Sequence, residues 1–186
     1  MLSTRLIYFL RQRFTFLLLT LIYTMLLPQT CPICARILRR SSRSSVRTVC
    51  TPCYGRLQPA PAVNVAGFGH VAAVWRYDED SAPLILAAKR FGGNSVMASL
   101  ATPLAEVLRP FVMASTVITW APPSSAGLRR RGFDQGRVLA SRTARRLQLP
   151  CAASLIRSGR AQFGSNRSIR MEGPRLALRP GWSTRP

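Results

Sequence analysis

The chain has 186 residues, of which 27 are basic and 6 acidic, giving a formal net charge of +21. Hydrophobic residues make up 47% of it, which excludes a wholly disordered chain and suits one compact domain with a small appendage. The charge favours a partner that carries phosphate. Because Lys89 is the only lysine, part of this charge also reflects a general bias toward arginine.

The first expected element is an apolar helix over residues 1–27. The run FTFLLLTLIYTMLL, Phe14–Leu27, follows Arg5, Arg11 and Arg13, as the apolar core of a signal peptide follows its basic region. The run is shorter than the roughly 20 residues of a spanning helix, and no small-residue cleavage site follows it. We therefore expect a cytoplasmic protein whose first helix packs on the domain or on a partner. Membrane attachment through this helix is the alternative.

Four of the five cysteines form the pattern of a metal site within residues 28–57. CPIC contributes Cys31 and Cys34, and CTPC contributes Cys50 and Cys53, in the spacing C-x2-C-x15-C-x2-C. Two residues between thiols allow both sulfurs to reach one tetrahedral ion from a tight turn, and four thiolates leave no open position. The spacing predicts a small zinc ribbon with a structural role. Disulfides compete with this interpretation only if the chain is exported.

The remaining features of this region are less specific. The expected hairpin between the two cysteine pairs contains arginines and no acid: Arg36, Arg39, Arg40, Arg43 and Arg47. These residues could contact nucleic-acid phosphates, but no aromatic residues for base stacking lie between them, which favours solvated charge. The fifth cysteine, Cys151, has no partner in the sequence and is expected to be a small buried residue.

Residues 58–69 are rich in proline, glycine and alanine, and we expect them to link the ribbon to a second domain over 70–186. The segment 70–77 predicts a strand, with the only histidine, His70, at the surface. A helix is expected from Ser81, as its cap, to the pair Gly92 and Gly93. A second helix over 94–111 should be kinked or divided at Pro103.

The last elements place a basic segment beside an expected sheet. A short buried strand over 115–120 and an amphipathic helix capped by Asp134 continue the alternation of strands and helices, which predicts an α/β fold with a mostly parallel sheet. The segment APPSSAGLRRRG, 121–132, is then a loop at the carboxyl end of a strand, where such sheets bind ligands. Arginines, serine hydroxyls and a helix N-terminus favour an anion there, although a solvated charge run is the alternative: Arg129, Arg130, Arg131, Ser124 and Ser125.

Three segments resemble successive landmarks of the ComF family: CPIC…CTPC, WRYDEDSAPLILAAKRFGG and VITWAPPSSAGLRRRGFDQGRVLA. Members are phosphoribosyltransferase-like proteins with an N-terminal zinc-binding module, associated with DNA uptake. The resemblance spans about residues 28–180 and departs from the family at Asp134, where members usually have asparagine. It implies that phosphoribosyl diphosphate binds near Ser124, Ser125, Arg129, Arg130, Arg131, Gly132, Gln135 and Lys89, beneath a flexible loop with Arg157, Arg160 and Gln162.

Part of the family pattern is missing from this sequence. Members continue into a strand that ends in two aspartates and a Thr-Thr-Gly turn, which holds the ribose and the 5′-phosphate. This chain ends RLALRPGWSTRP and has no Asp-Asp pair. We interpret it as a truncated member with an incomplete type I phosphoribosyltransferase-like sheet. We expect no transferase activity from it alone, identify no catalytic residue, and expect Mg²⁺ only in a complete member.

A second hypothesis belongs to a different functional class. In it the protein is a basic zinc-ribbon accessory protein that binds single-stranded DNA through its arginine-rich surface. Separately, the resemblance to the ComF family implies proteins of the competence machinery as further possible partners. This hypothesis predicts that the affinity for DNA falls steeply as salt rises.

Overall fold

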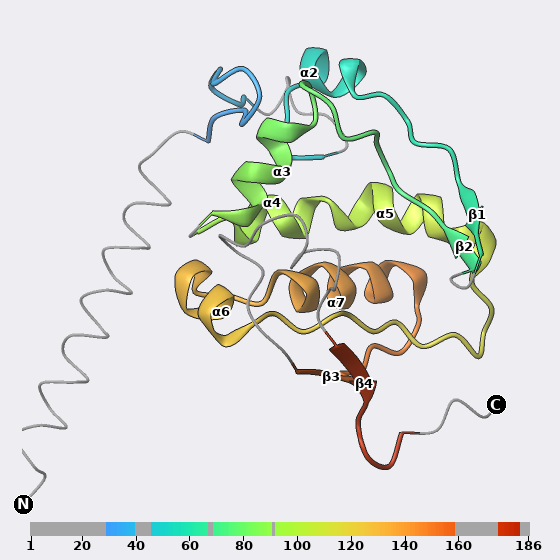
Figure 1. Cartoon of the computed structure of the whole chain (residues 1–186). Coiled ribbons are helices and arrows are strands. Elements are labelled where there is room, and N and C mark those ends of the chain that lie inside the picture. The colour runs from blue at the N-terminus through green and yellow to red at the C-terminus, as the bar shows by residue number, and fades with distance from the viewer. Residues whose placement is uncertain (1–28, 40–45, 67–68, 91, 159–174, 183–186) are drawn as a thin grey trace, which may run out of the picture.

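The computed structural model describes residues 29–39, 46–66, 69–90, 92–158 and 175–182. The expected helix over 1–27 lies outside these ranges, as do Arg40, Arg43, Arg160 and Gln162. The elements follow in chain order as α2 Thr51–Arg56, β1 Val63–Val65, β2 Gly69–Val71, α3 Ala82–Lys89, α4 Asn94–Ser99, α5 Ala101–Leu108, the 3-10 helix η2 Arg109–Phe111, α6 Ser125–Arg131, α7 Gln135–Leu147, β3 Leu155–Ser158 and β4 Arg175–Leu178 (Figure 1).

The chain combines helices with small sheets, but the strands pair differently from the prediction. Strand β1 is antiparallel to β2, and β3 is antiparallel to β4 with Leu155 opposite Leu178. Within the described residues, parallel pairing is limited to an isolated bridge between Ile118 and Cys151. The α/β composition is therefore present, whereas the mostly parallel sheet is not seen in the part of the chain that the structure describes.

The bridge between Ile118 and Cys151 closes one strand–helix–strand connection. The Ile118 N–H donates to the Pro150 carbonyl (2.9 Å), and the Ala152 N–H donates to the Ile118 carbonyl (3.0 Å), with α6 and α7 between the two segments. The expected buried strand over 115–120 is nevertheless half-exposed, since Val117 is 40% exposed. A parallel strand is buried only when helices cover both faces of its sheet, and this segment has a single bridge partner. Cys151 is likewise exposed rather than buried.

The segment 58–69, expected to be a linker, contributes to a two-stranded ribbon. The Arg76 N–H donates to the Gln58 carbonyl (2.9 Å), and Pro59 bridges Trp75 in antiparallel fashion. Farther along, β1 and β2 pair, and Gly69, the first residue of β2, adopts φ +74°, which glycine tolerates. Of the strand expected over 70–77, only its first two residues belong to β2, where His70 is exposed as predicted.

The helices predicted within the described residues form, and the way two of them begin or divide adds detail to the prediction. Ser81 is the N-cap of α3, but its hydroxyl donates to the Arg76 carbonyl (2.7 Å) and caps no helix N–H. The second helix is divided, as predicted, into α4 and α5. The break falls at Leu100 because Pro103 has no N–H for the Ser99 carbonyl and its ring would clash with that carbonyl.

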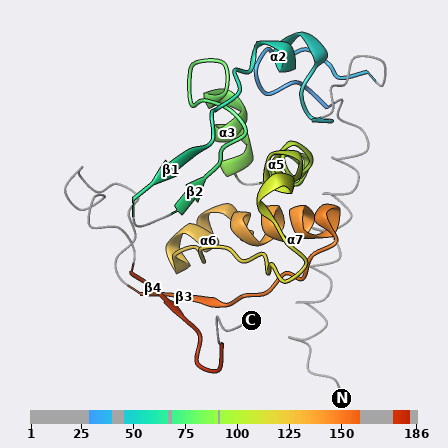
Figure 2. The ribbon, with the colours of Figure 1, turned by 90° about the vertical axis from the view of Figure 1, so that its right-hand side faces the viewer.

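One hydrophobic core joins the cysteine segment to the helices. Hydrogen bonding adds to this contact, since Thr48 Oγ1 lies 2.7 Å from Ser99 Oγ. In both views α2 lies beside the upper end of α3, whereas β3 and β4 lie at the opposite end of the molecule (Figures 1 and 2). The core consists of Cys31, Leu38, Val46, Val49, Cys50, Cys53 and Leu57 from the cysteine segment, with Leu84, Ala88, Met97 and Leu100 from α3, α4 and the residue after α4.

Candidate metal centre and anion-binding segment

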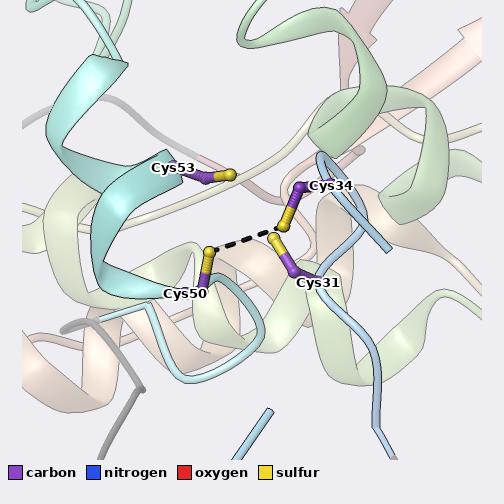
Figure 3. Close-up of side chains that lie close together, drawn as sticks. All are labelled: Cys31, Cys34, Cys50 and Cys53. Atoms are coloured by element: carbon purple, nitrogen blue, oxygen red, sulfur yellow. Dashed lines mark hydrogen bonds between the residues drawn. The ribbon is translucent and has the colours of Figure 1, made fainter. Parts of the chain in front are cut away.

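The four cysteines of the predicted metal site lie together. All their Sγ atoms are within 4.8 Å of one another, and Cys34 Sγ is 3.7 Å from Cys50 Sγ (Figure 3). A tetrahedral ion with metal–sulfur bonds of about 2.3 Å places its sulfurs roughly 3.8 Å apart. The donor set and the spacing therefore fit one tetrahedral ion. None of the five cysteines forms a disulfide.

Local backbone structure presents the two cysteine pairs to each other. The first pair lies on a turn in which the Ala35 N–H donates to the Cys31 carbonyl (2.8 Å) and Ala35 adopts φ +59°. The second pair uses a helix, because Cys50 is the N-cap of α2 and Cys53 lies one turn later. Pro52 occupies the first turn of α2, where its missing N–H costs nothing.

The thiols differ in acidity. Burial raises the pKa of the Cys31 thiol, but hydrogen bonds from the backbone of Cys50, Cys34 and Ile33 outweigh it and lower the pKa to about 7. Burial and the neighbouring thiols raise the pKa of Cys53 well above its ordinary value. A metal ion that takes all four sulfurs as thiolates must therefore displace protons, so binding is coupled to pH.

An arginine that sequence reasoning missed connects this centre to the rest of the domain. Arg56 Nη2 lies 3.9 Å from Cys53 Sγ, within range of a weak hydrogen bond, and 3.1 Å from Asp80 Oδ1. Its signal in the sequence is its position three residues after Cys53 on the same helix, which puts both side chains on one face. Groups that hydrogen-bond to metal ligands orient them and tune the bound metal.

The basic segment 121–132 is not the expected loop, because most of it forms helix α6. Ser124 is the N-cap, its Oγ accepting from the Gly127 N–H (3.1 Å), and Gly132 ends the helix at φ +77°. The three arginines occupy the last turn of α6, where positive side chains offset the partial negative charge of a helix C-terminus. The cap and the glycine stop account for a helix between the prolines and Phe133.

Two of the predicted phosphate ligands converge at the first turn of α6. A Cβ atom added to Gly127 would lie 2.8 Å from Arg131 Nη2 and 3.1 Å from Ser124 Oγ, so both side chains reach that point. Burial and Arg130 lower the pKa of Arg131, while Asp134 raises it. Arg131 Nε is buried and has no hydrogen-bond partner among the described residues. Ser125 begins α6 and is exposed, as are Arg129, Arg130 and Gly132.

The residues after Gly132 mainly fix the start of α7. Asp134 caps α7 as predicted, with Oδ1 accepting from the Arg137 N–H (3.0 Å), and its Oδ2 accepts from Trp120 Nε1 (2.9 Å). Gly136 allows the close approach of Trp120, because a Cβ there would lie 2.9 Å from the indole Cδ1. Gln135 Nε2 reaches the Ala88 carbonyl of α3 (3.4 Å). Residues 134–136 therefore stabilise the start of α7, whether or not they also contact a ligand.

The other predicted ligands lie on separate elements. Lys89, next to Ala88, lines a largely apolar cavity beside α3. Arg157 lies in β3, half-buried, and its Nε has no hydrogen-bond partner within the described ranges. The structure thus brings Ser124 and Arg131 together and places Gln135 near Lys89.

Comparison with protein-family models, with curated proteins and with solved structures finds no match. The described helices include none with the length and apolar character needed to cross a membrane. A functional assignment therefore depends on the cysteine cluster, on the arginines and on the geometry around α6.

Proposed function

We propose that this chain is a ComF-like, phosphoribosyltransferase-related protein. In this proposal the cysteine cluster holds a structural zinc ion, and the segment 121–135 binds the diphosphate of phosphoribosyl diphosphate. The observation that carries the proposal is the convergence of Ser124 Oγ and the Arg131 guanidinium on one point of α6. A hydroxyl and a planar guanidinium both donate to phosphate oxygens, and hydrogen bonds with charged groups are among the strong ones.

The electrostatic surroundings also support an anion. Asp134 is the only acidic residue between Ser124 and Ser158, and both its oxygens accept hydrogen bonds from the protein. Arg129 and Arg130 add two exposed cations to α6. In phosphoribosyl transfer, such groups stabilise the negative charge that develops on the departing diphosphate. Because carboxylates are scarce, this stretch has no pair of them to hold a metal ion that bridges to the ribose. We therefore propose that the chain binds phosphoribosyl diphosphate without catalysing its transfer.

The test is a calorimetric titration with pyrophosphate and with phosphoribosyl diphosphate. Arg131→Gln should weaken both ligands by at least about tenfold, since a charge-assisted hydrogen bond contributes roughly 1.5–3 kcal/mol. Arg145→Gln, on the exposed face of α7, removes the same charge elsewhere and should change the affinity less than about twofold. Equal losses in the two variants would show that only overall charge attracts the ligand and would refute the site.

A second function, binding of single-stranded DNA, is favoured by one feature of α7. Its exposed side carries four arginines, no acidic residue lies on the helix, and the four span about 14 Å: Arg137, Arg142, Arg145 and Arg146. Each phosphate contact on a single strand contributes about −0.7 to the slope of log affinity against log salt. Such a surface can bind phosphate backbones without reading sequence.

Variants on and off α7 distinguish this surface from general charge. Changing both Arg142 and Arg146 to Gln should make the salt slope shallower by about 1.4. The matched double variant Arg36→Gln with Arg109→Gln, at exposed positions elsewhere, should leave the slope nearer to that of the parent chain. Displacement of DNA by phosphoribosyl diphosphate would place both ligands on one surface and favour the phosphosugar site.

A further inference from the structure

A cavity of about 290 Å³ lies beside α3, separate from the cysteines and from α6. Its volume is just below the range of roughly 300–1,000 Å³ that is typical of small-molecule sites. Its apolar wall comes from the segment that pairs with Pro59, from α3, from the α4–α5 junction, from α5 and from α7: Trp75, Ile85, Leu100, Leu104 and Leu139. Water in an apolar space of this kind finds few hydrogen-bond partners, so an apolar body is the better occupant.

The aromatic wall of the cavity is held in place from the cysteine segment. Tyr54 of α2 contacts Trp75 edge to face, with ring centroids 6.0 Å apart and an interplanar angle of 88°. Trp75 is half-buried and its strand segment bridges Pro59, which further fixes its backbone. A ring in a fixed plane favours a flat aromatic partner, since aromatic pairs gain about 0.5–1.5 kcal/mol beyond their buried area.

The polar groups that remain for a ligand include two cations. The Ser81 hydroxyl donates to the Arg76 carbonyl, which leaves the side chains of Lys89 and Arg76 and the hydroxyl of Tyr77. Hydrogen bonds from Ser81 lower the pKa of the Asp78 carboxyl, and the nearby charge of Arg76 helps to lower it. This leaves Lys89 as the cation for a ligand. Lys89 forms no ion pair with any described residue. The nearest acids in the sequence, residues 78–80, precede the other end of α3, about 12 Å along the helix from Lys89. Asp80 among them is paired with Arg56. The Lys89 end of the cavity is therefore its positive end.

We propose that this cavity binds a small aromatic carboxylate, with the ring against Trp75 and Leu104 and the carboxylate on Lys89. One ammonium matches a monoanion. A dianionic phosphate would leave oxygens facing leucine side chains without partners, which is costly. No α6 residue lines the cavity, so this site is separate from the point where Ser124 and Arg131 converge, although the family resemblance also implied Lys89 as a phosphate ligand.

The chain allows a selective assay because Lys89 is its only lysine. Reductive methylation with ¹³C-formaldehyde labels Lys89 and the terminal amine alone and keeps the positive charge. Titration with naphthalene-2-carboxylate should shift the Lys89 methyl signal saturably and leave the terminal signal unchanged. Naphthalene-2-methanol, the neutral analogue, should bind about tenfold more weakly.

A variant and a control make the outcome decisive. Lys89→Met should abolish the preference for the carboxylate over the alcohol, measured by ligand-observed NMR, while the alcohol still binds. Circular dichroism and a measurement of metal content serve as controls that the Lys89→Met variant is folded. Arg131→Gln should leave both probes unaffected, so failure of the diphosphate site does not count against this one. The proposal is overturned if the carboxylate gives no saturable shift, if the alcohol binds equally well, or if Lys89→Met keeps the preference.

Discussion

Removing the metal from the four-cysteine site should loosen α3 and α4 as well as the cysteine segment. Seven of the eleven residues in the shared core come from that segment, and Val46 and Val49 are fully buried. Structural zinc contributes about 10–16 kcal/mol in zinc-finger peptides, whereas a whole domain is stable by only about 5–15 kcal/mol. Loss of the ion is therefore large enough to unfold the segment and uncover the faces of α3 and α4 that pack on it.

Hydrogen exchange followed by mass spectrometry measures this effect segment by segment. Peptides that contain α3 and α4 should lose protection when a chelator is added under reducing conditions. Cys53→Ser should reproduce the loss without chelator, since it removes one of the four ligands. Cys151→Ser is the matched control, because Cys151 lies outside the cluster, and it should keep one metal ion per chain and full protection. Unchanged exchange of α3 and α4 in metal-free protein would refute the coupling through a shared core.

Three further predictions concern single groups. Asp134→Ala should destabilise the protein to urea by about 2–4 kcal/mol, because α7 loses its cap and the Trp120 N–H loses its acceptor, whereas Asp134→Asn should retain most of the stability. Gly93→Ala should lower the thermal midpoint, because its Cβ would clash with the Ala87 carbonyl oxygen and lie 2.7 Å from the Ala88 carbonyl oxygen. Zinc binding should release protons near neutral pH, as measured by titration in buffers of different ionisation enthalpy, and weaken as pH falls, because the raised pKa of Cys53 keeps that thiol protonated.

Features set by short-range patterns could be predicted from the sequence. The spacing of the cysteine pairs predicted their meeting, because two residues between thiols largely fix the local turn. Asp134 predicted the start of α7, and Pro103 predicted the division before α5, since each acts within one helical turn. Helix α6 could have been found from Ser124 and Gly132, but its seven residues, SAGLRRR, include Leu128 as the only large apolar side chain and gave no apolar periodicity to outweigh the turn signals.

Features that depend on contacts distant in sequence could not be predicted. Nothing in the local sequence indicates that Pro59 pairs with Trp75. Residues 58–69 were therefore expected to be a linker, and residues 70–77 a strand. The strand over 115–120 has the composition of a buried strand, but burial depends on neighbouring strands and helices, and Ile118 has a single bridge partner. The shared core arises in the same way, because residues of the cysteine segment meet α3 only after the chain has folded back.

Helix α3 contacts the shared core, the apolar cavity and the start of α7. One side of it lies in the shared core through Leu84 and Ala88, Lys89 faces the cavity, and the Ala88 carbonyl accepts from Gln135 at the start of α7. A change in the position of α3 therefore reaches both proposed ligand sites, through Gln135 on one side and the cavity wall on the other. We expect metal removal to weaken pyrophosphate binding, although no cysteine lies on α6 or α7. Calorimetric titrations of the chelated and the zinc-loaded chain measure this directly. Equal affinities in the two states would mean that α6 and α7 hold their ligand groups without support from α3.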